Sequence, residues 1–231
     1  MAIQIDDAGI ATVTISGPER NLLNPTVMQA VSADLTAANE NEGVKAILIT
    51  GEGDTFCGGL DLAGIRAGGD PLDYASNLAA LLKIIPRLKK PIAASVNGDA
   101  VASGGSIVAA CDYAVALPTA KIGSYEVAVG VWPMVAQVPL IKRLGVKNAM
   151  ENIGSGNPLD AERAVELNLV NKIAEPDSLI EETKKWLRDA TRGGAANAGR
   201  VTFYELAELN YDDALDLSLI HISEPTRLLS I

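Results

Sequence analysis

The chain has 231 residues, of which 48% are hydrophobic and 21% charged, a balance typical of a globular domain large enough to bury a core. Its formal net charge of -10 argues against binding to nucleic acid or to an anionic membrane, since both require a basic surface. Cys57 and Cys111 lack the spacing of a metal site, and the sequence shows neither a signal peptide nor a membrane-spanning apolar stretch. We therefore expect a cytoplasmic protein with no metal.

Strands and helices alternate in the first half of the chain. Residues 10–15 alternate apolar and polar side chains, which predicts a half-buried strand. Residues 46–50 and 92–96 are rich in apolar side chains, which predicts buried strands. Asn24 and Pro25 supply an N-cap and a first-turn proline for a helix, and a second helix is expected over residues 72–88, ending or breaking near its proline.

The second half continues this alternation. We expect a buried helix over about residues 104–111, a strand over 113–116, a helix from Pro133 to about 144, a short helix over 159–167 and a strand over 170–173. Two further helices are expected over about residues 177–192 and 197–210. The pattern predicts an α/β fold with a core domain over residues 1–192 and the start of a C-terminal helical segment over 193–216.

The end of the chain has a different origin. Residues 217–227 are the amino acids that successive codons of a transposase-type sequencing adaptor encode. Residues 228–231 fit the index and the downstream adaptor that follow it. We therefore interpret residues 217–231 as non-native and expect the natural protein to continue beyond Asp216, so that the C-terminal helices are truncated. His221, the only histidine, is for this reason excluded as a catalytic or metal-binding candidate.

Two peptides rich in small residues, 56–61 and 101–106, each follow a predicted strand. Small side chains leave the main-chain N–H groups accessible. They therefore suit a site in which one N–H from each peptide points at the same developing oxyanion. Either peptide alone is also compatible with a simple tight turn. Together they predict an anion-stabilising site made of main-chain groups.

The chain resembles the crotonase superfamily of enoyl-CoA hydratases and isomerases. The similarity is carried by residues 51–62 and 90–98, by the Gly-rich helix start that follows, and by residues 122–133. It implies an α/β fold with a spiral of ββα turns, assembled as a homotrimer or a dimer of trimers. It also implies an acyl-CoA thioester as substrate, with no separate cofactor because coenzyme A is part of the substrate.

The resemblance assigns roles to individual residues. The oxyanion hole falls on the backbone N–H groups of Leu60 and Ser103, with Gly104 next to the second donor. Glu126 stands where similar enzymes carry a catalytic glutamate, and its apolar neighbours at 127–129 are expected to desolvate it in part. Without the resemblance, Glu126 reads as an exposed residue at a strand end.

One position departs from the two-glutamate hydratases, since Ser106 stands where those enzymes carry their other glutamate. A serine holds a water but is not an acid or base at neutral pH unaided. The favoured reading is hydration of a 2-enoyl-CoA by Glu126 alone; the alternatives are 3-enoyl-CoA isomerisation by the same residue and a catalytically silent acyl-CoA-binding protein. Asp99 is either a substitute carboxylate or a turn residue.

The resemblance also points to a surface for the substrate. Residues expected to border coenzyme A lie in two segments: Arg20 and Leu22, and Cys57, Gly58, Gly59 and Asp61. Trp132 either lines the acyl pocket or packs in the core. Asp61 and Asp112 are placed where a carboxylate caps a neighbouring backbone turn.

Overall fold

The computed structural model of this chain describes residues 3–223, with side chains as far as residue 220. Its centre is a six-stranded sheet in the order β1 (Gln4–Ile5), β2 (Ile10–Ile15), β3 (Ala46–Gly51), β4 (Ile92–Val96), β6 (Tyr113–Ala116) and β9 (Lys172–Ile173). Only β1 is antiparallel to its neighbour in this sheet. A smaller sheet contains β5 (Ala100–Val101), β7 (Lys121–Gly123) and β8 (Leu159–Asp160).

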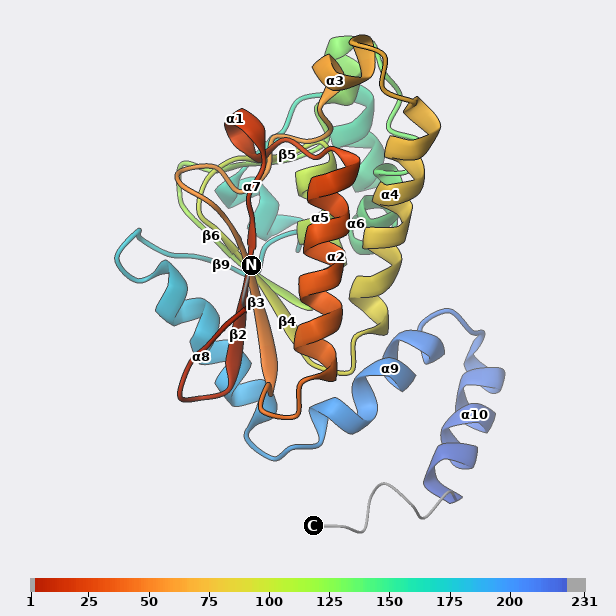
Figure 1. The fold of residues 1–231 in the computed structure, drawn as a ribbon. Helices are drawn as coiled ribbons and strands as arrows, with labels where there is room; N and C mark the ends of the chain where they lie inside the picture. The colour runs from red at the N-terminus through yellow and green to blue at the C-terminus, as the bar shows by residue number, and fades with distance from the viewer. Residues whose placement is uncertain (1–2, 224–231) are drawn as a thin grey trace.

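Helices connect and cover the strands (Figure 1). They are α1 (Pro18–Asn21), α2 (Pro25–Glu40), α3 (Leu62–Arg66), α4 (Pro71–Ile84), α5 (Ser103–Ala110), α6 (Gln137–Ser155), α7 (Ala161–Glu166), α8 (Leu179–Thr191), α9 (Ala196–Leu206) and α10 (Tyr211–Ser223). Two short 3-10 turns, η1 (Ile85–Arg87) and η2 (Glu126–Val129), follow α4 and β7.

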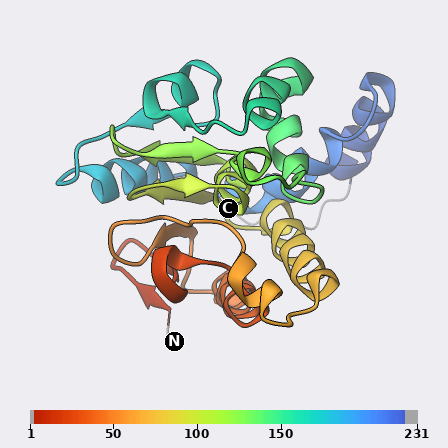
Figure 2. The same cartoon turned by 90° about the horizontal axis from the view of Figure 1, so that it is seen from above.

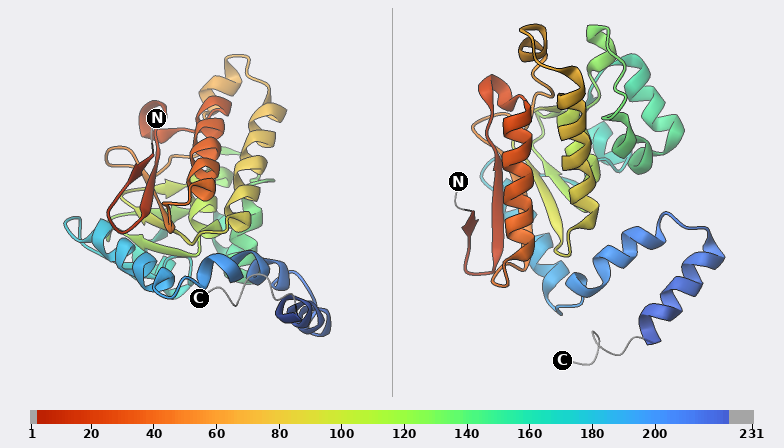
Figure 3. Two further views of the ribbon diagram at one scale, coloured as in Figure 1. Left: turned by 60° about the horizontal axis from the view of Figure 1, so that its bottom comes forward. Right: turned by 45° about the vertical axis from the view of Figure 1, so that its right-hand side comes forward.

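The central strands are buried on both faces. Helices α2 and α4 lie side by side over one face (Figures 1 and 3), where Val13 and Ile49 belong to the main hydrophobic cluster. Helix α8 packs on the other face, where its Leu187 joins Leu48 in a second cluster. Because both faces of β3 are covered, its first four residues are all apolar, as expected of a parallel strand.

Most of the predicted elements are confirmed. The four strands expected over residues 10–15, 46–50, 92–96 and 113–116 are present, and the side chain of Asn24 caps α2 by accepting a hydrogen bond from Val27 N–H at 2.9 Å. The second predicted helix ends at residue 84 and passes into a 3-10 turn at its proline.

Three boundaries were wrong. The helix expected from Pro133 begins at Gln137, after a hydrogen-bonded turn over residues 134–136. Its predicted end at about residue 144 coincides with a break at Gly145, where φ is +74°, and a second helical segment continues to Ser155. Residues 159–160, expected as helix, pair with β7 as strand β8, and the strand expected over 170–173 is limited to its last two residues.

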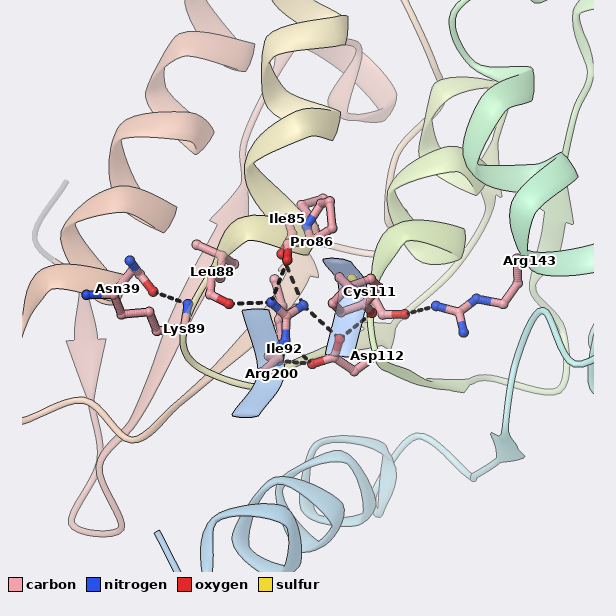
Figure 4. A network of polar contacts seen from close by, with 11 residues as sticks. Asn39, Ile85, Pro86, Leu88, Lys89, Ile92, Cys111, Asp112, Arg143 and Arg200 are labelled. Atoms are coloured by element: carbon pink, nitrogen blue, oxygen red, sulfur yellow. Dashed lines mark hydrogen bonds and ion pairs between the residues drawn. The ribbon is translucent and has the colours of Figure 1, made fainter. Parts of the chain in front are cut away.

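Helix α9 is held to the core by the buried Arg200, which is 7% exposed (Figure 4). Its guanidinium donates to both carboxylate oxygens of Asp112 at 2.7 Å and to the carbonyls of Ile85 and Leu88. Asp112 also accepts a hydrogen bond from Ile92 N–H at 2.9 Å, so its carboxylate has the structural role that was predicted, but at the start of β4 and not at the turn beside it in sequence.

Helix α10 packs against α9, and both lie at one side of the molecule, in blue in Figure 2. It continues from residue 216 into the segment interpreted as adaptor, of which residues 224–231 and the side chain of His221 lie outside the described residues. That interpretation stays a prediction, as does the division at residue 192. Within residues 3–223, the structure contains no helix with the length and hydropathy to cross a membrane.

Candidate active site

The two glycine-rich peptides lie against each other through their main chains. Phe56 and Cys57 donate their N–H groups to the carbonyl of Asp99 at 3.1 and 3.0 Å. In return, Val101 N–H donates to the carbonyl of Cys57 at 3.0 Å. The residues just before each predicted oxyanion donor are therefore paired as in a short piece of sheet.

Glycines allow the closest approach of these peptides. A Cβ atom at Gly59, whose φ is +97°, would lie 2.6 Å from Ala102 Cβ and 3.7 Å from Ser103 N. A Cβ at Gly104 would lie 2.4 Å from the carbonyl oxygen of Cys57. The distances of 2.6 and 2.4 Å exclude a side chain at the observed backbone positions, so the two peptides meet at a spacing that only glycine permits.

The N–H groups of Leu60 and Ser103 have no acceptor among the described residues. The neighbouring groups do pair: Leu23 N–H donates to Gly59 O at 2.8 Å, and Asp61 N–H donates to Leu23 O at 2.9 Å. Ser103 opens α5, so its N–H carries the partial positive charge of a helix N-terminus. The described part of the structure thus has two unpaired donors on adjacent peptides, at the positions predicted from the sequence.

Ala102 turns the chain into α5 with φ +54° and ψ -124°, a conformation that few residues other than glycine adopt. Such a backbone costs on the order of 1–3 kcal/mol and persists only where the surroundings impose it. Here Ala102 N–H donates to Gly123 O at 2.8 Å, extending the pairing of β5 with β7. The strain places Ser103 N–H at the end of the smaller sheet.

Glu126 lies on the continuation of β7, at the start of η2, and is half-buried. Its Oε2 accepts hydrogen bonds from Ser124 Oγ at 2.7 Å and from Tyr125 N–H at 3.0 Å. Oε1 accepts none from the described residues. The neighbours expected to desolvate the carboxylate are more open than predicted, since Ala128 and Val129 are exposed.

One backbone hydrogen bond joins the two parts of the site. Ser103 follows Ala102 directly, and Glu126 follows shortly after Gly123. The bond between Ala102 and Gly123 therefore has the unpaired Ser103 N–H on one side and the Glu126 carboxylate on the other.

Comparison with known proteins gives the chain a family. The model of the enoyl-CoA hydratase/isomerase family matches residues 6–205. The chain belongs to this family. A Thermus thermophilus protein assigned as an enoyl-CoA hydratase is 33% identical over 189 residues, covering 79% of this chain and 74% of the relative.

Other relatives agree. The crotonyl-CoA hydratase of Syntrophomonas wolfei is 29% identical, with 76% of this chain and 70% of that protein covered. The crystal structure of an enoyl-CoA hydratase from Mycobacterium smegmatis matches with a TM-score of 0.90 at 27% identity, covering 97% of this chain and 91% of that one. The chain is thus an enzyme of the hydratase/isomerase family with the crotonase fold predicted from its sequence.

In this hydratase/isomerase family member, Ser106 and Asp99 have structural partners. Ser106 is fully buried, and its hydroxyl donates to Ala136 O at 2.6 Å, which links α5 to α6. Asp99 accepts hydrogen bonds from the Arg20 guanidinium at 2.6 Å and from Lys121 N–H at 3.0 Å. Neither side chain is arranged here as a second acid or base.

The two segments expected to border coenzyme A lie together. Gly58 N–H donates to the carbonyl of Arg20 at 2.9 Å, and a Cβ at Gly58 would lie 3.2 Å from Leu22 Cδ2. The Arg20 side chain is 56% exposed at this edge, where it forms the ion pair with Asp99. The carboxylate of Asp61 accepts a hydrogen bond from Gly64 N–H at 2.8 Å and caps α3, which confirms its predicted capping role.

Cys57 and Trp132 have contrasting environments. Burial raises the pKa of the Cys57 thiol to about 12, so this residue contributes backbone and packing, and not a thiolate. Trp132 is 45% exposed, and its Nε1 donates to Gln137 Oε1 at 3.0 Å. This exposure rules out the core-packing interpretation of Trp132.

A cavity of about 650 Å³ lies between α4, α5, α6 and α9, at the end of α5 remote from Ser103. Ala109, Ala110 and Phe203 are among the residues that line it. It is therefore distinct from the site formed by the two peptides. Within the described residues, no group of three or more histidine, cysteine or carboxylate side chains is arranged to hold a metal ion.

Two residues of the site were missed by sequence reasoning. Ser124 contacts Glu126, and the buried Asn152 on α6 accepts a hydrogen bond from Ser124 N–H at 2.7 Å. Asn152 could have been noticed because asparagine is a poor helix former and here stands inside a helix. Ser124 itself carries no distinguishing pattern in the sequence.

Proposed function

We propose that this family member acts on acyl-CoA thioesters, binding the thioester oxygen with the N–H groups of Leu60 and Ser103 and transferring protons with Glu126. The main support is the pair of N–H groups without acceptors on peptides that meet at glycine spacing. By analogy with other oxyanion holes, each donor contributes roughly 3–4 kcal/mol to an enolate-like transition state. The reaction needs no metal and no cofactor besides the coenzyme A of the substrate.

The favoured reaction is hydration of a 2-enoyl-CoA. Glu126 Oε1 removes a proton from water while the water oxygen bonds to C3, and the electrons of the double bond move onto the thioester oxygen. The two N–H groups hold that oxygen as an enolate. The enolate then collapses as Glu126 returns the proton to C2, so one carboxylate serves in turn as base and acid.

Isomerisation of a 3-enoyl-CoA is the second candidate, and it is favoured by the engagement of Ser106 with Ala136 O. Glu126 would remove a proton from C2 and return it to C4 as the double bond moves to C2–C3. This reaction needs one base and no water. It therefore fits a site in which Asp99 and Asp61 already bind other groups.

We place the coenzyme A along Arg20, Leu22 and the loop of residues 57–61, with Trp132 against the acyl group. A phosphate of coenzyme A that bound the Arg20 guanidinium would compete with the ion pair between Arg20 and Asp99. A surface ion pair contributes about 0–1 kcal/mol, so a phosphate can displace it.

We also propose a homotrimer or a dimer of trimers in the cytoplasm. Apolar side chains on α6 support an assembly, since Val138, Val146 and Met150 are 53, 75 and 53% exposed and a subunit interface would cover such residues. The two free, buried cysteines are compatible with a reducing compartment. Sedimentation velocity tests the assembly, and a monomer at micromolar concentration would contradict it.

The test of function is turnover of 2-enoyl-CoA and 3-enoyl-CoA esters of several chain lengths in heavy water. Incorporated solvent hydroxyl identifies hydration, and a shifted double bond without it identifies isomerisation. In Glu126→Gln we expect ester affinity to remain while turnover falls by about 10²–10⁴-fold. Wild-type turnover by this variant would refute the assigned base, and binding without turnover by the unmodified chain would support the silent alternative.

A further inference from the structure

We propose that Ser124 is a positioning residue for Glu126 and that Asn152 holds Ser124 in place. This inference rests on the proposed role of Glu126. It concerns a serine and an asparagine whose side chains do not touch the substrate in the proposed mechanism. Both are buried, at 0 and 1% exposure.

Asn152 clamps the main chain of Ser124 from α6. Its Oδ1 accepts a hydrogen bond from Ser124 N–H at 2.7 Å, and its Nδ2 donates to Ser124 O at 3.3 Å and to Asn157 O at 2.9 Å. The amide thereby satisfies both main-chain groups of one residue, much as a neighbouring strand would. Buried amides with these groups satisfied are rigid elements of a fold.

Ser124 then fixes the carboxylate. Its hydroxyl donates to Glu126 Oε2 at 2.7 Å, and Tyr125 N–H donates to the same oxygen at 3.0 Å. The terminal torsion of a glutamate is broad when it is unrestrained, so two donors on one oxygen set the plane of the group. Oε1 is left without a partner among the described residues, and it becomes the oxygen that reaches the substrate.

Close backbone contacts at glycines connect Ser124 and Asn152 to the proposed oxyanion donors. A Cβ at Gly123, whose φ is +120°, would lie 2.6 Å from Asn152 Oδ1, and a Cβ at Gly105 would lie 2.7 Å from Gly123 Cα. Strand β7 is therefore held between α5 and α6 with no space for side chains at these points. The separation between Ser103 N–H and Glu126 is set by these contacts, and Ser124 sets the final orientation.

The experiment compares Ser124→Ala with Ser95→Ala, which removes an equally buried serine hydroxyl on β4 that makes no hydrogen bond to the described residues. We expect kcat of Ser124→Ala to fall about 10–100-fold, the range that follows from a misplacement of about 1 Å, with KM within about twofold of the unmodified value. Ser95→Ala should retain kcat. Urea unfolding of each variant separates loss of fold from loss of positioning.

A double-variant cycle supplies the decisive measurement. If Ser124 acts through Glu126, adding Ser124→Ala to Glu126→Gln should reduce the residual rate of proton exchange at C2 by less than about twofold. An equal further loss in both backgrounds would overturn the inference, as would a Ser124→Ala variant with unchanged kcat while Glu126→Gln is inactive. Unchanged turnover in Glu126→Gln would instead overturn the proposed function.

Ser124→Cys provides a second variant if Ser124→Ala does not fold, because it keeps a weaker donor in nearly the same volume. The expected order of kcat is serine, then cysteine, then alanine. A cysteine variant as active as the serine enzyme would contradict a role for the hydroxyl.

Discussion

Arg200→Met tests whether a buried polar network holds the C-terminal helices to the core. Methionine retains most of the apolar stem of arginine, so the variant removes mainly the guanidinium and its charge. That group forms two hydrogen bonds to Asp112 and donates to the carbonyls of Ile85 and Leu88, which end α4 and η1 (Figure 4). The variant therefore leaves a buried carboxylate and two helix-end carbonyls without their main donor.

The expected loss in the free energy of unfolding is about 3 kcal/mol. Removing one partner of a buried ion pair costs about 3–5 kcal/mol. The lower end applies here because Asp112 keeps two donors, Ile92 N–H at 2.9 Å and the Tyr204 hydroxyl at 2.6 Å. The docking energy of α9 sets an upper limit, since this helix can detach before the core unfolds.

Urea unfolding followed by circular dichroism measures the loss, and limited proteolysis near Gly193 and Gly194 detects detachment of α9. Arg163→Met is the control, because Arg163 pairs with Glu151 and Glu166 on the surface, where an ion pair contributes about 0–1 kcal/mol. A loss in Arg200→Met no larger than in the control would refute the reasoning, and it would mean that apolar packing alone holds α9.

Three substitutions and a change of pH provide further tests. Ser95→Ala should leave stability unchanged or raise it by up to about 1 kcal/mol in urea unfolding, because the buried Ser95 hydroxyl has no hydrogen-bond partner within residues 3–223. Gly104→Ala should lower stability by about 1–3 kcal/mol and reduce turnover, whereas Gly199→Ala, with open space around it inside α9, should stabilise by about 0.5–1 kcal/mol. Burial raises the pKa of Cys57 and Cys111 to about 12, so the folded state holds both protons more tightly than the unfolded state. The free energy of unfolding should then fall as pH rises from about 9 toward 12, and neither thiol should react with a labelling reagent at neutral pH until the chain unfolds.

The sequence predicts the central strands because burial on both faces leaves a direct mark on composition. Residues 46–50 contain four apolar side chains in a row, and the structure buries them between α2 and α8. Strands β5, β7 and β8 leave no such mark, since two or three residues are too few to show a period. Strands β5 and β8 were missed, and β7 was expected only as an unbounded strand before Glu126, although β5 and β7 carry Ser103 and Glu126 on their continuations.

The polar network of the C-terminal segment was equally hidden. Asp112 and Arg200 lie 88 residues apart in the chain, and each alone resembles an ordinary charged residue. A structural role for Asp112 was expected, but the backbone N–H that it accepts from belongs to Ile92, 20 residues earlier in the chain. The pairing with Arg200 was not predictable, because it depends on how α9 folds back on the core.

The glycine-rich peptides could be recognised in the sequence for a physical reason, and the same reason limits what they say about the reaction. Gly59 and Gly104 are required by contacts of 2.6 and 2.4 Å that any Cβ would make, so the sequence records the close approach of two backbones. Such contacts create donors for an anion but no group that moves a proton. In the proposed function that group is Glu126, which lies just after β7, the strand that pairs with β5. The proposed reaction therefore depends on how this short strand is held, and Asn152 and Ser124 form the hydrogen bonds that hold its end.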